Sequence, residues 1–497
     1  MLDRVNDLTQ AKEPLLMMLE ASRQAEQDTG KGNFLDQVQS VRVIRGIWSY
    51  DNPALAISEK IGAIGAETVG TLIGGNQNQA VINQTASEIL NKGLDIALIT
   101  GAENGNSATK ARKAGVELPV TSTPGKYDKV IGAAQQPEHH DHEVAKGIRT
   151  AIQVYPMYDN AIRHHRKESL EAHMVRVSSL WKRFNDIGCE NPNAWVQTAM
   201  TAEQIRTPSR TNRRISFPYT KFMNANMSVN MGAALIMCSV RKARELGIDP
   251  SKWVYPWAGV SGYDHFSASV RDNFYTSPGI RLVAKKLLEL SDTQVDQLDT
   301  VDLYSCFPSA VQIAAQEYGL KEDRPLTVTG GLTFGGGPLN NYVMHSIART
   351  VELLRQTTNG RGLVSANGGN LYKHVHGIYG KEPPKNDFCV ANVQDQINAL
   401  PSRKCLPVFR GKATIESYTV MYDSNEQPTM GHISCLTPEG HRTWVNTQDP
   451  ELTDAMTVSE FCGRNITISD EGRRLTITSK LLRKKKCTAH QHTECLA

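Results

Sequence analysis

The hydrophobic positions between residues 79 and 100 predict a helix followed by a buried strand. Over 79–91, apolar side chains recur at the three- and four-residue spacing of an amphipathic helix. Gly93 is placed to end that helix, because glycine readily takes the left-handed conformation of a helix C-terminus. The apolar run over 95–100 then predicts a buried strand, which leads into small residues at 101–105.

A second stretch repeats this order. Apolar positions at helical spacing predict a helix over 340–355, and glycines at 360–362 break it. The run 363–365 predicts a strand that ends in a turn of small residues at 366–369. Two stretches with one pattern favour a fold built from two similar halves.

A third strand and helix lie between the two repeats. The strand predicted at 301–304 runs into a helix that begins at Pro308, a residue typical of the first helical turn, and ends near Gly319. Continuous apolar strands that alternate with helices indicate parallel sheets covered on both faces. The sequence therefore predicts an α/β fold.

The remaining segments differ from the core in composition and in hydrophobic pattern. Residues 155–218 are rich in arginine, lysine and tryptophan, which predicts a helical insertion or lid. From about residue 401, short strand-like runs separated by turns predict a small β-barrel or sandwich over 401–480. The polar tail 481–497 is expected to be disordered.

Composition excludes several classes of protein. The longest uncharged apolar stretch, near 232–240, is too short to cross a bilayer, and no secretory signal opens the chain, so a cytoplasmic protein without a membrane span is expected. The nine cysteines form no CxxC pair, which argues against a disulfide framework or a zinc site. The histidines at 139, 140 and 142 fit a solvated loop better than a metal site, and no metal is expected. The net charge of +4 neither requires nor excludes a nucleic-acid partner.

Three glycine-rich turns are candidates for a ligand cleft. They are the turns at 74–77, 330–341 and 366–369, two of which precede a predicted helix. Glycines let the backbone approach a ligand closely, and helix N-termini favour anionic or carbonyl oxygens. The Gly-Lys-Ser/Thr ending of a phosphate-binding loop is absent.

Several long blocks stand in order along nearly the whole chain: GGNQNQAVINQTASEILNKGLDIALITGAE, NPNAW, FPYTKFM, VDLYSCFPSAV, TVTGGLTFGGGPLNNYVMHSIA and SANGGNLYKHVHGIYG. Together they resemble the thiolase superfamily, and most closely thiolase-like proteins of type 1. The resemblance implies a five-layered α-β-α-β-α core of two βαβαβαββ halves, followed by an OB-like β-barrel domain. It implies halves at 1–230 and 231–398. A thiolase core opens with a strand before its first helix, here at 13–27, so the resemblance also implies an N-terminal truncation.

The residues that perform thiolase chemistry have all changed. The nucleophilic cysteine of the family corresponds to Gly75, and the histidine that activates it corresponds to Gly337. The second cysteine, an acid and base, corresponds to Ala366, and the residue that orients an oxyanion-hole water corresponds to Tyr304. The resemblance therefore implies the scaffold without the usual Claisen machinery.

Four residues remain as candidates for catalysis. Cys306 could replace the nucleophile if His345, His374 or His376 lay close enough to act as its base, although a buried structural thiol is the favoured interpretation. His374 is a candidate acid or base, and a role in holding a loop is an equal alternative. The other two candidates are Tyr304 and Asn76.

Coenzyme A or an acyl-CoA is the expected ligand, with no permanently bound cofactor. The candidate binding residues are Gly75, Gly336, Gly337, Asn340, Asn367, Gly368, Arg213 and Lys221. The two basic residues would meet phosphates, and the asparagines would donate hydrogen bonds to a thioester carbonyl.

The leading hypothesis is an acetyl-CoA acetyltransferase-like acyltransferase of lipid metabolism with its usual catalytic residues replaced. The first alternative is a non-catalytic module that binds acyl-CoA, a protein partner or another copy of the chain. The second is nucleic-acid binding through the C-terminal domain, whose set of basic and aromatic residues is thin.

Overall fold

The structure, a computed structural model, describes residues 1–132, 138–469 and 474–477. The first half of the core contains α1 (Pro14–Asp28), β1 (Ser40–Val43), α2 (Pro53–Ile61), β2 (Glu67–Thr71), α3 (Gln77–Asn91), β3 (Ile96–Asn104), α4 (Gly105–Ala114), β4 (Lys129–Ile131) and β7 (Asn230–Cys238). Its sheet has the order β4-β2-β1-β3-β7, in which β7 alone runs antiparallel to its neighbour.

The second half repeats this plan. It contains α9 (Val240–Glu245), β8 (Tyr255–Tyr263), α10 (Pro278–Leu290), β9 (Thr300–Asp302), α11 (Pro308–Tyr318), α12 (Tyr342–Leu354), β10 (Arg361–Gly368), β11 (Lys373–Gly380), β12 (Cys389–Asn392) and α13 (Gln394–Asn398). The sheet order is β12-β8-β11-β10-β9. Here β10 and β11 are antiparallel, as β3 and β7 are in the first half.

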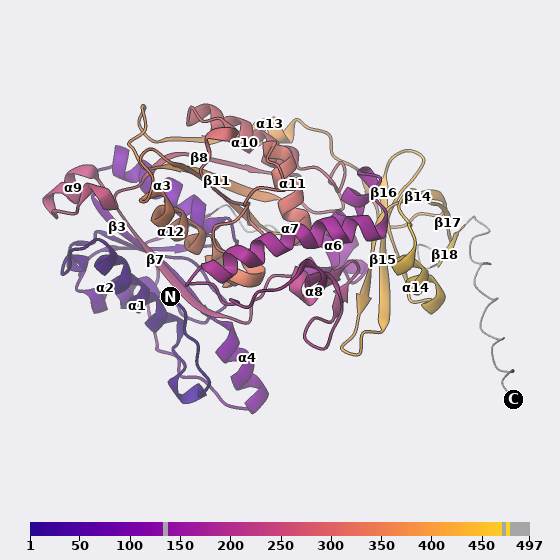
Figure 1. Ribbon diagram of the computed structural model, residues 1–497, viewed down its shortest axis with the longest axis horizontal. Helices are drawn as coiled ribbons and strands as arrows, with labels where there is room; N and C mark the ends of the chain where they lie inside the picture. The colour runs from indigo at the N-terminus through magenta and orange to yellow at the C-terminus, as the bar shows by residue number, and fades with distance from the viewer. Residues whose placement is uncertain (133–137, 470–473, 478–497) are drawn as a thin grey trace, which may run out of the picture.

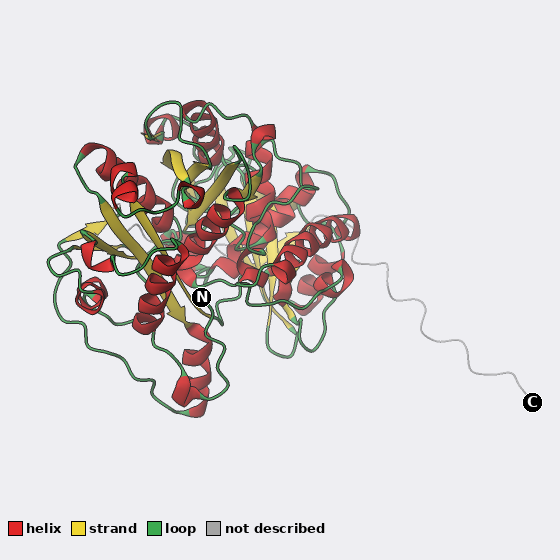
Figure 2. Cartoon of the chain, turned by 60° about the vertical axis from the view of Figure 1, so that its left-hand side comes forward, coloured by secondary structure: helices red, strands yellow, loops and turns green. Residues whose placement is uncertain are grey.

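The two sheets enclose a central pair of helices. Helices α3 and α12 contact strands of both sheets, while α1 and α2 cover the outer face of the first sheet and α10 the outer face of the second (Figure 1). The core therefore consists of two layers of strands and three layers of helices, which Figure 2 shows from another side. The predicted α/β fold with helices on both faces of each sheet is confirmed.

The helix and strand predictions agree with the structure except at three strand ends, one of which is the strand predicted at 301–304, which ends at Asp302. Gly93 has φ +72°, as expected of a residue just past α3. The small residues at 101–104 and 366–368, expected in turns, instead extend β3 and β10. In both cases an antiparallel neighbour, β7 or β11, supplies hydrogen bonds along the whole extension. Pairing overrides the weak strand preference of small residues.

The basic segment between the sheets forms α5 (Asp141–Ala145), α6 (Ala151–His165), α7 (Leu170–Glu190), α8 (Ala202–Arg206), β5 (Arg214–Ser216) and β6 (Tyr219–Thr220). Helix α6 is buried along 154–163 and packs between α11 and the C-terminal sheet. Its Asn160 donates a hydrogen bond from Nδ2 to the carbonyl of Tyr418, 2.9 Å away. This segment therefore joins the core to the C-terminal region (Figure 1).

The C-terminal strands form a third, β-rich unit at one end of the molecule, on the right in Figure 1. It contains β13 (Cys405–Leu406), β14 (Gly411–Tyr422), β15 (Pro428–Leu436), β16 (Arg442–Thr447), α14 (Pro450–Val458), β17 (Asn465–Ser469) and β18 (Arg474–Ile477). Its sheet has the order β13-β16-β15-β14-β17-β18, and β5 also pairs with β14. The expected β-rich C-terminal domain is present, while the tail 481–497 lies outside the described residues.

Candidate functional site

Gly75 lies in the turn between β2 and α3, where the resemblance places a nucleophile. A Cβ atom on this residue would stand 2.5 Å from the hydroxyl oxygen of Tyr304 and 2.5 Å from the carbonyl oxygen of Asn367. Both distances are far below van der Waals contact. The Tyr304 hydroxyl therefore takes the space that a side chain at position 75 would need.

Tyr304 is held in place from two sides. It follows β9, and its backbone N–H donates to Oγ of Ser365 over 2.8 Å. Its ring packs edge-on against Tyr342, with centroids 5.6 Å apart. Burial raises the pKa of Tyr304 well above its usual range, so the hydroxyl keeps its proton. No hydrogen bond joins this hydroxyl to another residue in the described part of the chain, which leaves it free to donate to a ligand.

Two buried asparagines follow the turns on either side: Asn76 comes directly after Gly75, whereas Asn367 turns its carbonyl to Gly75 and its side chain to the outer face of β10, which it shares with His374 of β11. Nδ2 of Asn76 donates to the hydroxyl of Tyr263 over 3.3 Å, and Nδ2 of Asn367 donates to the hydroxyl of Tyr155 over 3.0 Å. The side-chain oxygens of both asparagines are buried without a partner among the described residues. A buried acceptor left unpaired costs about 1–3 kcal/mol. Of the two, the Asn76 oxygen lies beside Gly74 and Gly368 and can accept a hydrogen bond from a ligand's amide or hydroxyl group there.

Lys373 is a site residue that the sequence analysis missed. It opens β11 and is only 7% exposed. The Lys373 side chain passes close to Gly368. Because Gly368 has no side chain, nothing from that residue separates Lys373 from Asn76. The Nζ atom lies over the ring of Tyr372, 5.1 Å from the centroid, and 3.8 Å from a carboxylate oxygen of Glu138. The sequence does hold a signal for this residue, because a lysine stands among the mainly apolar and aromatic residues of Leu371–Val375.

Asn340 holds the turn before α3 through hydrogen bonds of its side chain within the protein. Its Oδ1 accepts the backbone N–H of Gly74 over 3.1 Å, and its Nδ2 donates to the carbonyl of Arg45 over 2.6 Å. Its own carbonyl accepts from Nδ2 of Asn78. All polar groups of the side chain are engaged within the protein, so its direct role here is to fix the turn before α3.

Gly336 and Gly337 lie in the turn before α12. The N–H of Gly337 donates to the carbonyl of Asn226 over 2.9 Å, and a Cβ atom on Gly337 would stand 3.2 Å from that same oxygen. Gly336 has φ +111°, and a Cβ there would collide with Sδ of Met231 at 2.5 Å. Both glycines serve close backbone packing.

Cys306 is poorly suited to act as a nucleophile. It is 8% exposed, and burial raises the pKa of its thiol to about 12. A thiol needs its thiolate form to attack a carbonyl carbon. The three histidines considered as its base have other surroundings: His376 meets the hydroxyl of Tyr318 at 2.7 Å, His374 meets Asp264 at 3.1 Å, and His345 lines a separate cavity.

His374 faces the outer layer of helices. Along β11, Gly377 and Tyr379 approach Gln79 of α3, whereas His374 and His376 alternate with them and point toward α10 and α11. Nε2 of His374 lies 3.1 Å from Oδ2 of Asp264 and 3.4 Å from Oγ of Ser277. Burial alone would raise the pKa of Asp264, but the His374 hydrogen bond and the Arg271 charge bring it to about 2. The structure does not bring His374 next to Gly75.

The basic candidates lie in the segment that joins the C-terminal domain. Arg213 is half-buried and donates to the carbonyl of Arg214, whose strand pairs with β14, while Lys221 is exposed. Within that domain, Tyr418 and Trp444 are 0% and 2% exposed. Neither ring is available to stack on a nucleic-acid base.

Among the described residues, no three histidine, cysteine, aspartate or glutamate side chains are grouped so that they could hold a metal ion. In the same part of the chain, every helix is too short or too polar to span a membrane.

Comparisons with known proteins agree with this fold. A family model described as the thiolase-like protein type 1 additional C-terminal domain matches residues 392–473. A monomeric SCP2-thiolase-like protein type 1 from Mycobacterium smegmatis is 27% identical, with a TM-score of 0.82, and the match covers 96% of this chain and 97% of that one. A search of proteins with curated descriptions gave no match.

More distant structures share the fold of the core. The Ltp2–ChsH2(DUF35) aldolase is 19% identical, with a TM-score of 0.55, over 74% of this chain and 94% of that chain. An acetyl-CoA acetyltransferase from Syntrophomonas wolfei is 13% identical, with a TM-score of 0.50, over 75% and 94%. The two-half core with its β-rich C-terminal domain therefore matches the fold of a thiolase-like protein of type 1, and residues 392–473 match the additional C-terminal domain of such proteins.

Proposed function

We propose that the protein binds coenzyme A or an acyl-CoA at the N-terminal end of α3, and that it does so without the cysteine acyl-enzyme step of thiolases. The observation that carries the proposal is the free Tyr304 hydroxyl in the space beside Gly75. A protonated hydroxyl at that place donates to the thioester carbonyl instead of being acylated by it.

The surrounding groups suit the rest of such a ligand. The unpaired side-chain oxygen of Asn76 is an acceptor for an amide N–H group of a pantetheine chain. The side chain of Lys373 passes beside Gly368 on the face that Asn76 approaches, and its ammonium, 3.8 Å from a carboxylate oxygen of Glu138, is the positive charge at this end of β11 that favours an electron-rich oxygen. The name of the Syntrophomonas wolfei relative, an acetyl-CoA acetyltransferase, supports this class of ligand.

The proposal makes the chain a relative of acyltransferases that works on acyl-CoA in the cytoplasm as part of lipid metabolism. It assigns direct ligand contacts to Tyr304, Asn76 and Lys373, the fixing of the turn to Asn340, and only a backbone approach to Asn367. Gly75 and Gly368 keep the approach open, because a side chain at either position would fill it. His374 and Cys306 take structural roles.

Replacing Tyr304 by phenylalanine is expected to weaken acetyl-CoA binding about three- to tenfold, the effect of losing one hydrogen bond of about 1 kcal/mol. Isothermal titration calorimetry measures the dissociation constant directly. Tyr422→Phe, in the C-terminal domain, is the matched control and should leave binding unchanged. Equal affinity of wild-type protein and Tyr304→Phe would refute the assigned contact.

A further inference from the structure

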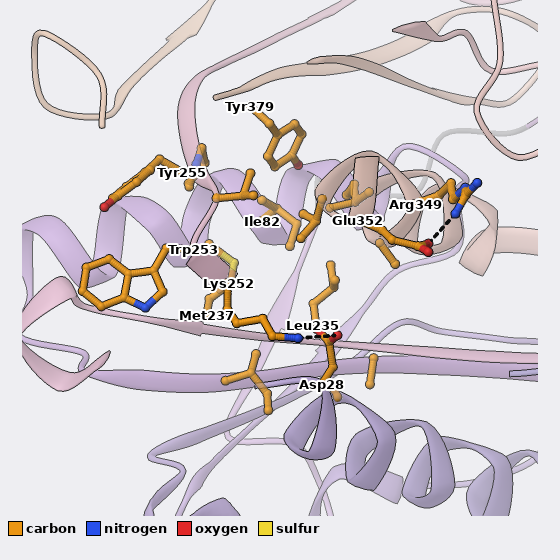
Figure 3. Close-up of a pocket in the computed structure, with 18 of the residues that line it drawn as sticks. Asp28, Ile82, Leu235, Met237, Lys252, Trp253, Tyr255, Arg349, Glu352 and Tyr379 are labelled. Atoms are coloured by element: carbon orange, nitrogen blue, oxygen red, sulfur yellow. Dashed lines mark ion pairs between the residues drawn. The ribbon is translucent and has the colours of Figure 1, made fainter. Parts of the chain in front are cut away.

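A cavity of about 890 Å³ lies along the outer edge of β7, between α1, α3 and α12. Figure 3 shows Ile82, Leu235, Met237 and Tyr379 on its walls. In the second half of the core, β8 takes the corresponding place beside β11. Because the described part of the first half has no strand there, the cavity marks a strand position of the fold rather than a pocket shaped for a ligand.

A different feature of the molecule is the polar contact between α6 and the C-terminal sheet. Helix α6 packs against β14 and its neighbours (Figure 1). Alternate residues of β14 and β15, such as Tyr418 and Ile433, belong to the apolar core of the domain on the other face of the sheet. The residues between them are polar and at most 2% exposed, and they are Ser417, Thr419, His432 and Ser434. Hydrogen bonds rather than apolar packing therefore have to satisfy this contact.

His432 is the titratable residue of that polar row. Its Nδ1 atom lies 3.0 Å from Oδ1 of Asn446 on β16, and its Nε2 atom lies 3.0 Å from Nε2 of Gln153 in the first turn of α6. Nδ2 of Asn446 in turn donates to the carbonyl of Lys146 over 2.7 Å. His432 therefore ties β15 and β16 to the segment 146–153, which leads into α6.

The surroundings of Gln153 determine which ring nitrogen of His432 carries the proton. Oε1 of Gln153 accepts the backbone N–H groups of Arg149 and Thr150, at 2.8 and 3.0 Å, and the hydroxyl of Thr150 at 3.0 Å. Nε2 of Gln153 donates to the carbonyl of Gly147 over 2.9 Å, which leaves its second N–H for His432. Rotating the amide would break all of these bonds. Nε2 of His432 is therefore an unprotonated acceptor, and Nδ1 carries the ring proton.

A second proton on His432 would have no acceptor. It would place an N–H donor of the ring against the N–H donor of Gln153, 3.0 Å away. It would also place a positive charge on a residue that is only 2% exposed. The neutral ring is therefore the form that this contact holds.

The charged groups on the elements around His432 do not favour a protonated ring. Lys146 and Arg149, on the segment before α6, are both cations. Glu416 of β14 is an acidic residue, and its carboxylate is already paired with Arg442 of β16 at 2.6 Å. A charge on His432 would therefore gain no new partner from these groups.

The segment 146–153 leads directly to the helix that supports the candidate site. Two residues beyond Gln153, the hydroxyl of Tyr155 donates to the carbonyl of Gly369 over 3.1 Å and accepts from Nδ2 of Asn367 over 3.0 Å. The carbonyl of Asn367 faces Gly75. His432 thus acts on the end of α6 that lies nearest to the turn beside α3.

We propose that His432, with its bonds to Gln153 and Asn446, is an acid-sensitive latch between the C-terminal domain and α6. When Nε2 takes up a proton from water, the new N–H repels the amide of Gln153, and the segment 146–153 separates from β15 and β16. Other bonds between α6 and the domain, such as that from Asn160 to the carbonyl of Tyr418, stay in place, so the opening is local. The latch does not depend on acyl-CoA binding.

The direction of the pH effect follows from the two states of the latch. Burial lowers the pKa of His432, although its hydrogen bond with Asn446 opposes this. In the open segment the pKa returns toward its ordinary value of about 6.5. The open state therefore binds the proton more tightly, and the stability of the latch, complete above about pH 6.5, falls as the pH drops from there toward the pKa of the closed state. In that window the equilibrium constant for opening rises by up to about tenfold per pH unit.

Hydrogen exchange of the full chain without ligand measures this opening. The reporters are the amides of Arg149 and Thr150, because Gln153 holds both. After correction for the intrinsic exchange rate, we expect their protection in the wild type to fall about tenfold between about pH 7 and about pH 5.5. Amides in the middle of β14 should keep their protection within about twofold.

Two variants separate the latch from a general effect of acid. His432→Gln keeps an acceptor for Gln153 and a donor for Asn446 but cannot take up a proton, so its protection should not depend on pH. Gln153→Glu gives the protonated ring an acceptor, so acid should no longer open the segment. His164→Gln, at an exposed position near the other end of α6, is the matched control and should respond to acid as the wild type does.

Two results would overturn the proposal. One is equal protection of Arg149 and Thr150 in the wild type at both pH values, and the other is the same loss of protection in His432→Gln. If that variant does not fold, the nitrogen-15 spectrum of histidine-labelled wild-type protein makes the test alone. The latch requires the proton on Nδ1 of His432 at neutral pH, and a proton found on Nε2 would overturn it.

Discussion

Replacing Arg442 by methionine is expected to lower the free energy of unfolding by about 3–5 kcal/mol, the usual cost of breaking a buried ion pair. The guanidinium group is 0% exposed. It donates two hydrogen bonds to the Glu416 carboxylate, at 2.7 and 2.6 Å, and others to the carbonyls of Ala268, Ser269 and Arg271. Methionine fills similar space but leaves these acceptors unpaired.

Because Ala268, Ser269 and Arg271 belong to the core and Glu416 to β14, Arg442 joins the C-terminal domain to the core. We therefore expect urea denaturation of Arg442→Met to show both a lower midpoint and earlier loss of the C-terminal sheet. Lys412→Met, at an exposed position of β14, the strand that carries Glu416, is the control and should change stability by less than about 0.5 kcal/mol. A loss below 1 kcal/mol for Arg442→Met would show that the contacts do not hold the domain.

Restoring a cysteine at position 75 is expected to destabilise the protein by about 1–3 kcal/mol, without conferring thiolase activity. Its Cβ would stand 2.5 Å from the hydroxyl oxygen of Tyr304 and from the carbonyl of Asn367. The tyrosine ring can be removed, but the backbone carbonyl cannot. Adding Tyr304→Asn should therefore restore only part of the lost stability.

Thermal denaturation with circular dichroism measures the effect. Gly32→Cys is the matched control, because a Cβ on Gly32 meets nothing within 4 Å and its φ is not in the left-handed region. That variant should keep the stability of the wild type within about 0.5 kcal/mol. Unchanged stability of Gly75→Cys would mean that the space beside α3 is open, contrary to the packing described here.

Hydrophobic spacing predicts the core elements well where local pattern and tertiary pairing agree. Helices α3 and α12 and the strands after them follow directly from the positions of their apolar residues and glycines. The ends of β3 and β10 do not, because antiparallel partners from distant segments extend them. Strand β7, with apolar residues but no alternation, gives no local signal for its place at a sheet edge.

Some residues of the candidate site can likewise be placed from the sequence, and others cannot. Gly75 and Tyr304 can be placed from the resemblance, and the structure brings them into contact. His374 and Lys373 are neighbours in sequence, yet one faces the outer helices and the other approaches Asn76. Which of the two enters the site depends on the register of β11, and a shift of one residue would exchange them. No sequence pattern fixes that register.

The most direct test of the account is to incubate the purified protein with acetyl-CoA and measure three quantities. These are binding by calorimetry, acylation by intact mass spectrometry, and thiolysis of acetoacetyl-CoA by loss of its absorbance. The account predicts saturable binding, no covalent acyl adduct and no thiolysis, because Gly75 carries no nucleophile, the Tyr304 hydroxyl fills the space beside it, and the Cys306 thiol stays protonated. An acyl group found on Cys306, or thiolysis that Cys306→Ala abolishes, would contradict it.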